Sequence, residues 1–308
     1  MFDIIGIGES DVDLFLRVKQ MPGRGEKVRG EEIGRLPGGI IGNFCSQASK
    51  TGVSVGIVSV VGDDENGRFI LDDYEERGID IAGIYVDKEE KTFYCVVFLD
   101  DSGEKYLTAV VTPLVSPSPD RIDYGYVKQA KYVHMCSMDY ELVSAVVREL
   151  EGSGVKISLD YESHAQNAGW DHWKPVFEKV SVLFTNEEGM AGLFPECSLE
   201  EGSFRLLSLG IETLVVTCAH RGGYVFSGNI KHHYRAFAAK RIIDTTGAGD
   251  SFNAAFLSAR IKGMDVREAA DYAAAAASFV IQKEGARTGQ QDDKAIRSFL
   301  ESGPERIE

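Results

Sequence analysis

The 308-residue sequence predicts an α/β fold in which a doubly wound, mainly parallel sheet lies between two layers of helices. Short apolar runs recur along the chain, and they are continuous rather than alternating, as is typical of strands buried on both faces. Helical patterns lie between these runs, so that strand and helix alternate. Apolar residues make up 44% of the chain, enough for a substantial core, and 33 glycines against eight prolines indicate many tight turns.

The expected strands are six apolar runs, at residues 2–8, 53–62, 132–138, 155–161, 180–185 and 213–218. The expected helices are at residues 42–52, 66–78, 139–154, 248–264, 265–283 and 292–303. The helix expected at 139–154 has apolar residues at helical spacing and ends at a glycine. The alanine run at 273–277 indicates a helix with a flat, closely packed face.

Two segments, 11–36 and 90–111, break the alternation and resemble paired strands joined by polar turns. Their β-branched and aromatic content favours strands over long loops, and Asp-Ser-Gly at 101–103 is a hairpin signal. We therefore expect a small sheet appended to a main domain. The boundaries that follow are 1–10, 37–89 and 112–308 for the main domain, and 11–36 and 90–111 for the small sheet.

Composition excludes several classes of function. The net charge of -15 is spread along the chain, which argues against nucleic-acid and anionic-membrane partners because both need clustered basic residues. Five widely spaced cysteines without a CxxC pair argue against a zinc site or a disulfide framework, and they predict free thiols in a cytoplasmic protein. No apolar run reaches the ~18 residues of a membrane span, and the first residues lack the features of a signal peptide.

The chemistry is concentrated in DTTGAGDSF, residues 244–252, where Gly247 and Gly249 precede Asp250 at the start of an expected helix. Free N–H groups and the helix dipole favour an anion there, and glycines allow a phosphate to approach closely. Asp250 would oppose a phosphate unless it acts as a base. We expect it to stay ionised near neutral pH and to take a proton from a substrate hydroxyl during phosphoryl transfer. The alternative is that Asp250 caps the helix.

Other kinase motifs are missing from the sequence. There is no GxxxxGK[ST] of a Walker P-loop, and no HRD or DFG of a protein kinase. DTTGAGDSFNAAFL (244–257) instead resembles the C-terminal signature of the ribokinase-like, or PfkB, family of carbohydrate kinases. GGIIGN (38–43) resembles the family's GGxxxN, GESDVD (8–13) follows the first strand where that family places sugar-binding residues, and VGDDENG (61–67) resembles a recurrent turn.

The resemblance implies a three-layer, ribokinase-like α/β domain with a β-sheet lid over the sugar, often a homodimer contact. It also implies transfer of the γ-phosphate of ATP, with Mg²⁺, to a hydroxyl that is usually a primary CH₂OH. Asp250 would be the base, and the amides of Gly247, Ala248 and Gly249 would form the anion hole. The expected sugar-binding residues are Asp11, Asp13, Gly39 and Asn43. The expected nucleotide-binding residues are Asn186, Thr217, Ala219 and Gly222.

The resemblance also places a monovalent cation such as K⁺ at Asp244 and Thr246, although these residues could simply order the turn. Asp11 and Asp13 lie two apart and share one face of a strand; exposed charges on an edge strand are the alternative. For Asn43 the alternative is an N-cap of the following helix.

Three stretches depart from the family pattern. The family's NxxE motif holds a glutamate that organises Mg²⁺, but TNEEGMAG (185–192) has Gly189 in that place. Glu187 or Glu188 could substitute through water, or both could be first-turn acids that favour the helix dipole. VTCAHRGG (216–223) has Ala219 where the family usually has glycine, and its methyl group could narrow the ATP site. Several sugar-kinase subgroups have a DxNxR-like stretch, which appears here as DYESH (160–164). Glu162 and His164 thus replace the amide and the guanidinium side chains of that stretch.

The sugar-binding segments carry no lysine, so we expect a neutral sugar, polyol or nucleoside. Arg17, Arg29, Arg35 and Lys105 in the expected lid are the main argument against a neutral substrate, and their default interpretation is as exposed solubilising charges. A nucleoside kinase and a sugar-phosphate kinase remain alternatives, as does a non-enzymatic sugar sensor. An NAD-dependent oxidoreductase is suggested by GIGESD (6–11), but Asp11 stands where that fingerprint needs a small residue.

Overall fold

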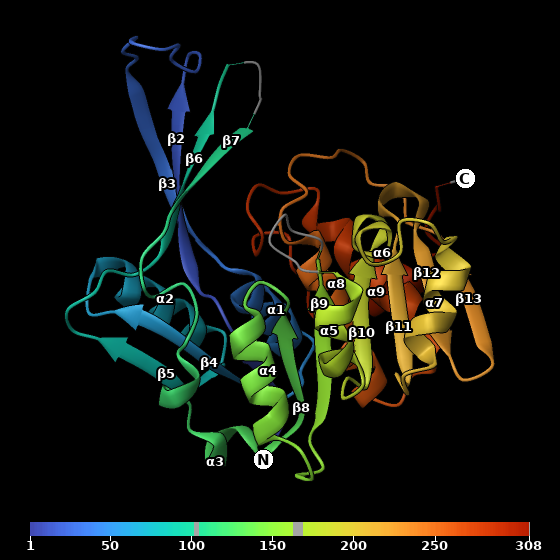
Figure 1. Cartoon of the computed structure of the whole chain (residues 1–308). Helices are drawn as coiled ribbons and strands as arrows, with labels where there is room; N and C mark the ends of the chain where they lie inside the picture. Colours follow the sequence, from blue (N-terminus) through green and yellow to red (C-terminus); the bar gives the residue numbers. More distant parts are fainter. Residues whose placement is uncertain (102–104, 163–168, 308) are drawn as a thin grey trace.

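Nine strands form one large sheet in the computed structural model, which describes residues 1–101, 105–162 and 169–307 (Figure 1). The strand order is β13-β12-β11-β10-β9-β8-β1-β4-β5. The strands are β1 (Phe2–Ile7), β4 (Val55–Gly62), β5 (Asp80–Asp87), β8 (Ala130–Cys136), β9 (Lys156–Tyr161), β10 (Val182–Asn186), β11 (Thr213–Thr217), β12 (Gly223–Ser227) and β13 (Ile230–Tyr234). Neighbouring strands between β5 and β11 in this order pair in parallel. The strand β12 pairs antiparallel with both β11 and β13. The six predicted strands are confirmed.

Helices cover both faces of this sheet. One layer contains α1 (Ile40–Lys50), α2 (Glu65–Glu76), α8 (Ala248–Ile261), α9 (Val266–Val280) and α10 (Asp293–Glu301), whose buried residues join one core cluster. The other contains α3 (Tyr124–Val127), α4 (Tyr140–Glu149), α5 (Trp170–Phe177), α6 (Glu187–Leu193) and α7 (Leu199–Leu207), which join the second. The predicted three-layer, ribokinase-like α/β architecture is therefore confirmed, and all six predicted helices are present.

A small sheet stands apart from the large one (Figure 1), and its strand order is β3-β2-β6-β7. Its strands are β2 (Asp11–Val18), β3 (Gly30–Gly38), β6 (Tyr94–Leu99) and β7 (Lys105–Val110). Strands, not long loops, thus occupy the two segments that break the alternation. Ser102 and Gly103 of the predicted hairpin turn lie outside the described residues, as does His164. The exact domain boundaries stay a prediction.

The packing of α8 fixes the place of its N-terminus. Residues 251–259 of the helix are buried, and the alanine run of α9 lets the two helices approach closely because the side chains between them are small. All five cysteines are free thiols, four of them buried. None of the helices in the described part of the chain has the length and apolar character that a membrane span requires.

Candidate active site

The N-terminus of α8 is shaped to receive an anion. Gly247 precedes the helix with a φ of 74°, a left-handed conformation that favours glycine, and an added side chain would collide with Ala286. Within the described residues, the N–H groups of Gly247 and Gly249 have no hydrogen-bond acceptor, and that of Ala248 makes only a long bond of 3.3 Å to the Thr245 carbonyl. Unpaired amides at the positive end of a helix dipole attract a phosphate.

Asp250 is the third residue of α8, not its cap, so the capping alternative is wrong. Its Oδ2 accepts a hydrogen bond of 2.9 Å from Nδ2 of Asn43 in α1. Asn43 is buried and lies inside the first turn of α1, whose N-cap is Gly39, so the capping alternative is wrong for Asn43 as well. The two motifs, 207 residues apart in sequence, therefore meet at a single hydrogen bond.

Asp250 does not behave as the sequence predicted. Burial raises its pKa to about 7, the bond from Asn43 opposes the rise, and the negative charges of Glu162 and Glu9 add to it. The carboxyl group is thus partly protonated at neutral pH instead of fully ionised. Such a pKa suits a group that must accept a proton and release it again near neutrality.

Arg287 completes this network, and the sequence analysis missed it. Its Nε donates a 2.9 Å hydrogen bond to Oδ1 of Asn43, which orients the amide so that Nδ2 faces Asp250. The guanidinium is buried, pairs with Asp73 at 2.6 Å, donates to the Gly38 carbonyl and lies over the ring of Tyr74. It therefore links the base to α2 and to the start of α1.

A buried acid, Asp160, is close enough to Asp250 for the two charges to influence each other. Asp160, at the end of β9, accepts a hydrogen bond of 2.8 Å from Asn253 of α8. Burial raises its pKa well above the usual range, and Glu162 and Asp250 raise it further. The negative charges around Asp250 therefore disfavour its ionised form until a positive partner or a proton-donating substrate is present.

Asp11 and Asp13 meet on one face of β2. They are 6% and 8% exposed, and β2 is an inner strand of the small sheet, so these residues are not the exposed edge charges of the alternative interpretation. Cys95 of β6 donates to Oδ2 of Asp11 at 3.5 Å, and Oδ1 of Asp11 has no partner among the described residues. Burial raises the pKa of both carboxyl groups, that of Asp11 well above its usual range.

Two glycines make room for these acids. A side chain on Gly38 would collide with the carboxylates of Asp11 and Asp13. Gly39 has a φ of 85°, and a side chain there would collide with the backbone of Glu9 and Ser10. The GGxxxN motif thus keeps the backbone beside β2 free of side chains and leads directly into the helix that carries Asn43.

Asp244 and Thr246 form a tight turn before α8. Oδ1 of Asp244 accepts from the N–H of Thr246 at 3.0 Å and from its hydroxyl at 2.7 Å, while Oδ2 accepts from the N–H of Gly285. Lys105 of β7 also reaches this turn, with Nζ 2.7 Å from the Thr246 hydroxyl. The expectation that Lys105 is merely a solubilising charge is therefore wrong.

The predicted nucleotide residues lie at the carboxyl ends of two neighbouring parallel strands. Asn186 ends β10 and is paired in register with Thr217, which ends β11. Ala219 follows with a φ of 50°, a conformation that alanine rarely adopts, and Gly222 has a φ of 86°. Ligands of open α/β sheets bind in this position, outside the carboxyl ends of the strands.

A family model described as pfkB family carbohydrate kinase matches residues 1–293. The chain belongs to this family. Membership agrees with β2, which begins at Asp11, where a dinucleotide-binding fingerprint would place a helix. The oxidoreductase alternative is therefore wrong.

Relatives of this pfkB-family kinase span almost its whole length. ATP-dependent ribose-1-phosphate kinase of Halopiger xanaduensis is 26% identical, covering 97% of this chain and 98% of the relative. 5-Dehydro-2-deoxygluconokinase of Shouchella clausii is also 26% identical, covering 97% and 96%. The structure of Arabidopsis thaliana ribokinase complexed with ribose and ATP superposes with a TM-score of 0.85 at 23% identity, covering 97% and 98%, which shows a shared fold.

The NxxE glutamate is missing from this pfkB-family kinase, and the neighbouring Glu187 and Glu188 are not clear replacements for it. Asn186 caps α6 by accepting from the N–H of Gly189 at 2.7 Å. Glu187 is paired with Arg221 through two contacts of 2.5 Å, and Glu188 is an exposed acid in the first turn of α6. Because Glu187 already has a cationic partner, Glu187 and Glu188 do not fit a dedicated Mg²⁺ site.

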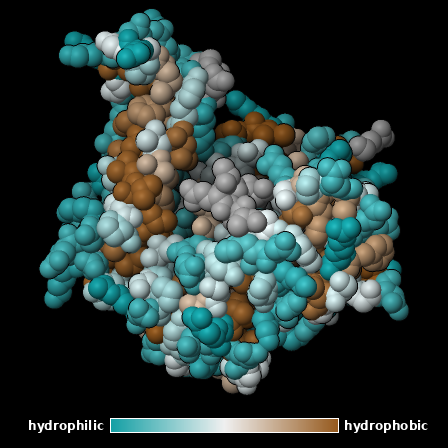
Figure 2. Space-filling view, viewed as in Figure 1, coloured by the Kyte–Doolittle hydropathy of each residue, from teal (hydrophilic) through white to brown (hydrophobic). Residues whose placement is uncertain are grey.

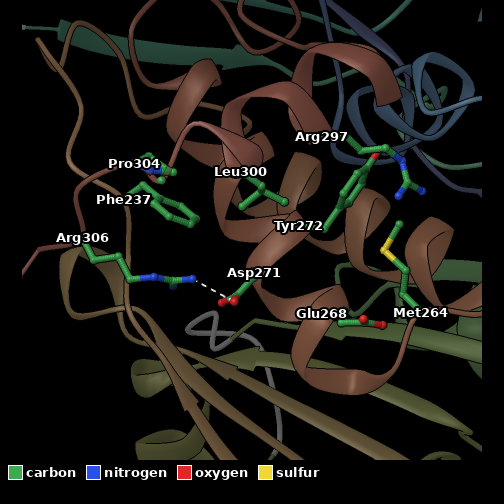
Figure 3. A pocket seen from close by; sticks show the side chains of 10 residues that line it. Phe237, Met264, Glu268, Asp271, Tyr272, Arg297, Leu300, Pro304 and Arg306 are labelled. Carbon is green, nitrogen blue, oxygen red and sulfur yellow. Dashed lines mark ion pairs between the residues drawn. The ribbon is translucent and has the colours of Figure 1, made fainter.

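A hollow in the described part of the kinase lies away from the predicted site residues. It has a volume of about 420 Å³ and lies between α9, α10 and the C-terminal segment (Figure 3). Three of its charged groups take part in ion pairs, Arg306 with Asp271 and Arg297 with Asp293, which lies outside the hollow. It contains none of the predicted site residues.

Proposed function

We propose that this pfkB-family kinase transfers the γ-phosphate of ATP to a hydroxyl, a primary CH₂OH, of a small neutral sugar or polyol. The observation that carries the proposal is the position of Asp250, which has a pKa near 7 and stands beside unpaired amides at the tip of α8. A base and an anion hole on one helical turn are what phosphoryl transfer to an alcohol requires.

In this mechanism Asp250 takes the proton of the substrate hydroxyl. The hydroxyl oxygen then forms a bond to the terminal phosphorus while the bond to the leaving ADP oxygen breaks. Asn43 holds the carboxylate in place through its 2.9 Å hydrogen bond. The amides of Gly247, Ala248 and Gly249 stabilise the negative charge on the transferring group, and they do so without rearrangement because the helix already fixes them.

The carboxylates of Asp11 and Asp13 support a neutral, hydroxyl-rich acceptor. A buried carboxylate oxygen without a donor is unfavourable, and a sugar hydroxyl would supply the missing hydrogen bond. In their ionised form these acids would repel an anionic group instead. Gly39 and Asn43 border the same space, so we place the sugar between β2 and the start of α1.

The nucleotide would lie across the ends of β10 and β11, at Asn186, Thr217, Ala219 and Gly222, with its phosphates at the α8 turn. Mg²⁺ would be carried by the phosphates of ATP, whose charge it neutralises. A solved structure of a putative ribokinase II from E. coli in complex with ATP and Mg²⁺ shares the fold, with a TM-score of 0.84 at 21% identity. We assign no step of the reaction to the metal through Glu187 or Glu188.

The small sheet would act as the lid over the sugar and as a homodimer contact. Alternate residues put Asp11 and Asp13 on its pocket-facing side, and Leu14, Leu16, Val96 and Phe98 on the other. The latter are partly exposed, and apolar side chains cover much of the small sheet (Figure 2). A second copy of the chain would bury this stripe. Light scattering of the purified protein tests the proposal, because a strictly monomeric mass at micromolar concentration contradicts it.

The reaction is tested by incubating the protein with ATP, Mg²⁺ and a panel of sugars, polyols, nucleosides and sugar phosphates, and measuring ADP release and the phosphorylated product. We expect turnover with a neutral sugar or polyol. Turnover only with a nucleoside or a sugar phosphate would change the proposed substrate class. Binding of a sugar without ADP release would instead indicate a sensor.

A further inference from the structure

Lys105 joins the small sheet to the turn that precedes α8. Its Nζ lies 2.7 Å from the Thr246 hydroxyl and 3.4 Å from each carboxylate oxygen of Asp244. The side chains of Lys105 and Asp244 are 28% and 10% exposed, so the ion pair is largely shielded from solvent. The contact spans two parts of the chain that are 139 residues apart.

Lys105 also faces the sugar pocket. In register it lies opposite Leu99 of β6, on the same face of the small sheet as Asp13 and Phe15. Its Nζ is 5.7 Å from the centre of the Phe15 ring, within the range of a cation–π contact. Its positive charge lowers the pKa of Asp13, against burial and the charge of Asp244, which raise it. The ammonium group therefore lies between the sugar-binding acids and the phosphate-binding turn.

The residues expected to bind a monovalent cation do not fit that ion here. The Asp244 carboxylate already accepts hydrogen bonds from Thr246 and Gly285, and Lys105 lies against both of its oxygens. Burial alone would raise the pKa of Asp244, but these hydrogen bonds and the charge of Lys105 bring it below its ordinary value. An ammonium group carries the same charge as K⁺ and binds the same oxygen atoms, so a single site cannot hold both cations.

We propose that Lys105 supplies this positive charge from the small sheet, so that turnover needs no monovalent cation and the site is electrostatically complete only when the small sheet is closed. This inference rests on the proposed function. Thr246 directly precedes Gly247, so an uncompensated Asp244 would repel the phosphates at the α8 turn. Lys105 acts through Asp244 and is a positioning residue.

The first test measures turnover in chloride salts of K⁺, NH₄⁺ and tetramethylammonium at equal ionic strength, with an acceptor from the panel above. We expect the unmodified chain to be equally active in all three salts. In tetramethylammonium, Lys105→Ala should lose roughly tenfold to a hundredfold in kcat, the range expected for one charged contact. K⁺ or NH₄⁺ should restore most of this loss by entering the space that the lysine leaves.

Two variants serve as controls. Lys27→Ala changes an exposed lysine in the connection between β2 and β3, and it should retain full activity in every salt. Lys105→Met keeps most of the apolar stem but lacks the charge, so it should lose activity and respond less to added ions than Lys105→Ala. This pattern separates a missing charge from a general defect in folding.

The second test does not depend on turnover. Thermal melting of Lys105→Ala should shift to higher temperature in K⁺ or NH₄⁺ relative to tetramethylammonium, whereas the unmodified chain and Lys27→Ala should show no selective shift. The inference is overturned if the unmodified chain requires K⁺, or if Lys105→Ala responds selectively to neither ion in either test. A chain that phosphorylates nothing refutes the proposed function, and the melting measurement still decides the role of Lys105.

Discussion

The candidate active site has two ends, which we call the phosphate end, at Asp250, and the sugar end, at Asp11 and Asp13. The acids at the two ends differ in the hydrogen bonds that they receive. At the phosphate end, Asp250 receives a hydrogen bond from Asn43, which Arg287 in turn orients, and its pKa is about 7. At the sugar end, Asp11 has one weak thiol donor and an oxygen without a partner among the described residues, and its pKa is raised well above the usual range.

Burial raises the pKa at both ends, and the ends differ in the next contribution, which is the hydrogen bond from Asn43 for Asp250 and the negative charge of Asp13 for Asp11. The phosphate end is oriented before any substrate arrives, which suits a group that must transfer a proton at a fixed place. The sugar end keeps unused hydrogen-bonding capacity, which suits a group that a ligand completes. The comparison therefore predicts that substitutions at the phosphate end change kcat and those at the sugar end change KM.

The largest expected effect is that of Asp250→Asn. Loss of the base should lower kcat by roughly 10²- to 10⁴-fold, while melting at pH 8 should not fall because an uncharged amide avoids the cost of burying a charge. Initial rates of ADP release and a thermal melt measure both. Glu141→Gln, at an exposed acid in the first turn of α4, is the matched control and should change neither. Near-normal turnover in Asp250→Asn would remove this residue from the mechanism.

Replacing Arg287 tests whether the phosphate end is held by its network. Arg287→Met should destabilise the fold by about 3–5 kcal/mol, the usual loss when a buried ion pair is broken, as measured by urea unfolding. Arg287 lowers the pKa of Asp250, so its removal should move the acid limb of kcat/KM to higher pH. Arg287→Lys keeps the charge and should move that limb less. An unchanged limb in both variants would show that Arg287 only supports the fold.

Asp13→Asn tests the sugar end. We expect KM for the acceptor to rise roughly 10- to 100-fold, the loss of one or two charged hydrogen bonds, with a smaller change in kcat. Because the pKa of Asp13 is raised, the folded state keeps the proton of this carboxyl group at a higher pH than the unfolded chain does. Asp13 therefore lowers the stability of the fold as the pH rises from the unfolded-state pKa through the folded-state pKa. Asp13→Asn should therefore melt no lower than the unmodified chain at pH 8. A change confined to kcat would undo the division between the two ends.

The sequence predicted the phosphate end better than its surroundings. The α8 turn, Asp250 and the glycines are contiguous in one motif, and Asn43 lies in another. Arg287 lies in a turn-rich stretch without periodicity, and its contact with Asn43 spans 244 residues, so no local pattern announces it. Lys105 is similar, because its partners Asp244 and Thr246 lie 139 and 141 residues further along the chain, in the turn before α8.

The fold shows the same division. The predicted strands are continuous apolar runs buried on both faces, as in β4, where every residue is buried. The strands β5, β12 and β13 went unpredicted because they lie toward the sheet edges and carry exposed or polar positions. The short helices α5 and α7 were missed too, and α5 contains Pro175, which weakens a helical pattern.

The smallest expected effect concerns backbone conformation on the nucleotide side. Ala219 has a φ of 50°, which costs an L-residue roughly 1–2 kcal/mol, whereas glycine loses about 0.5–1 kcal/mol through its unfolded-state freedom. Ala219→Gly should therefore stabilise the fold by up to about 1.5 kcal/mol. Ala191→Gly, at an exposed position inside α6, should instead destabilise it by about 0.5–1 kcal/mol.

The opposite signs of these two alanine-to-glycine changes, measured by urea unfolding, are the test of strain at Ala219. If the methyl group also narrows the ATP site, Ala219→Gly should lower KM for ATP, whereas Ala191→Gly should leave it unchanged. Destabilisation by both variants would show that the left-handed turn carries no strain.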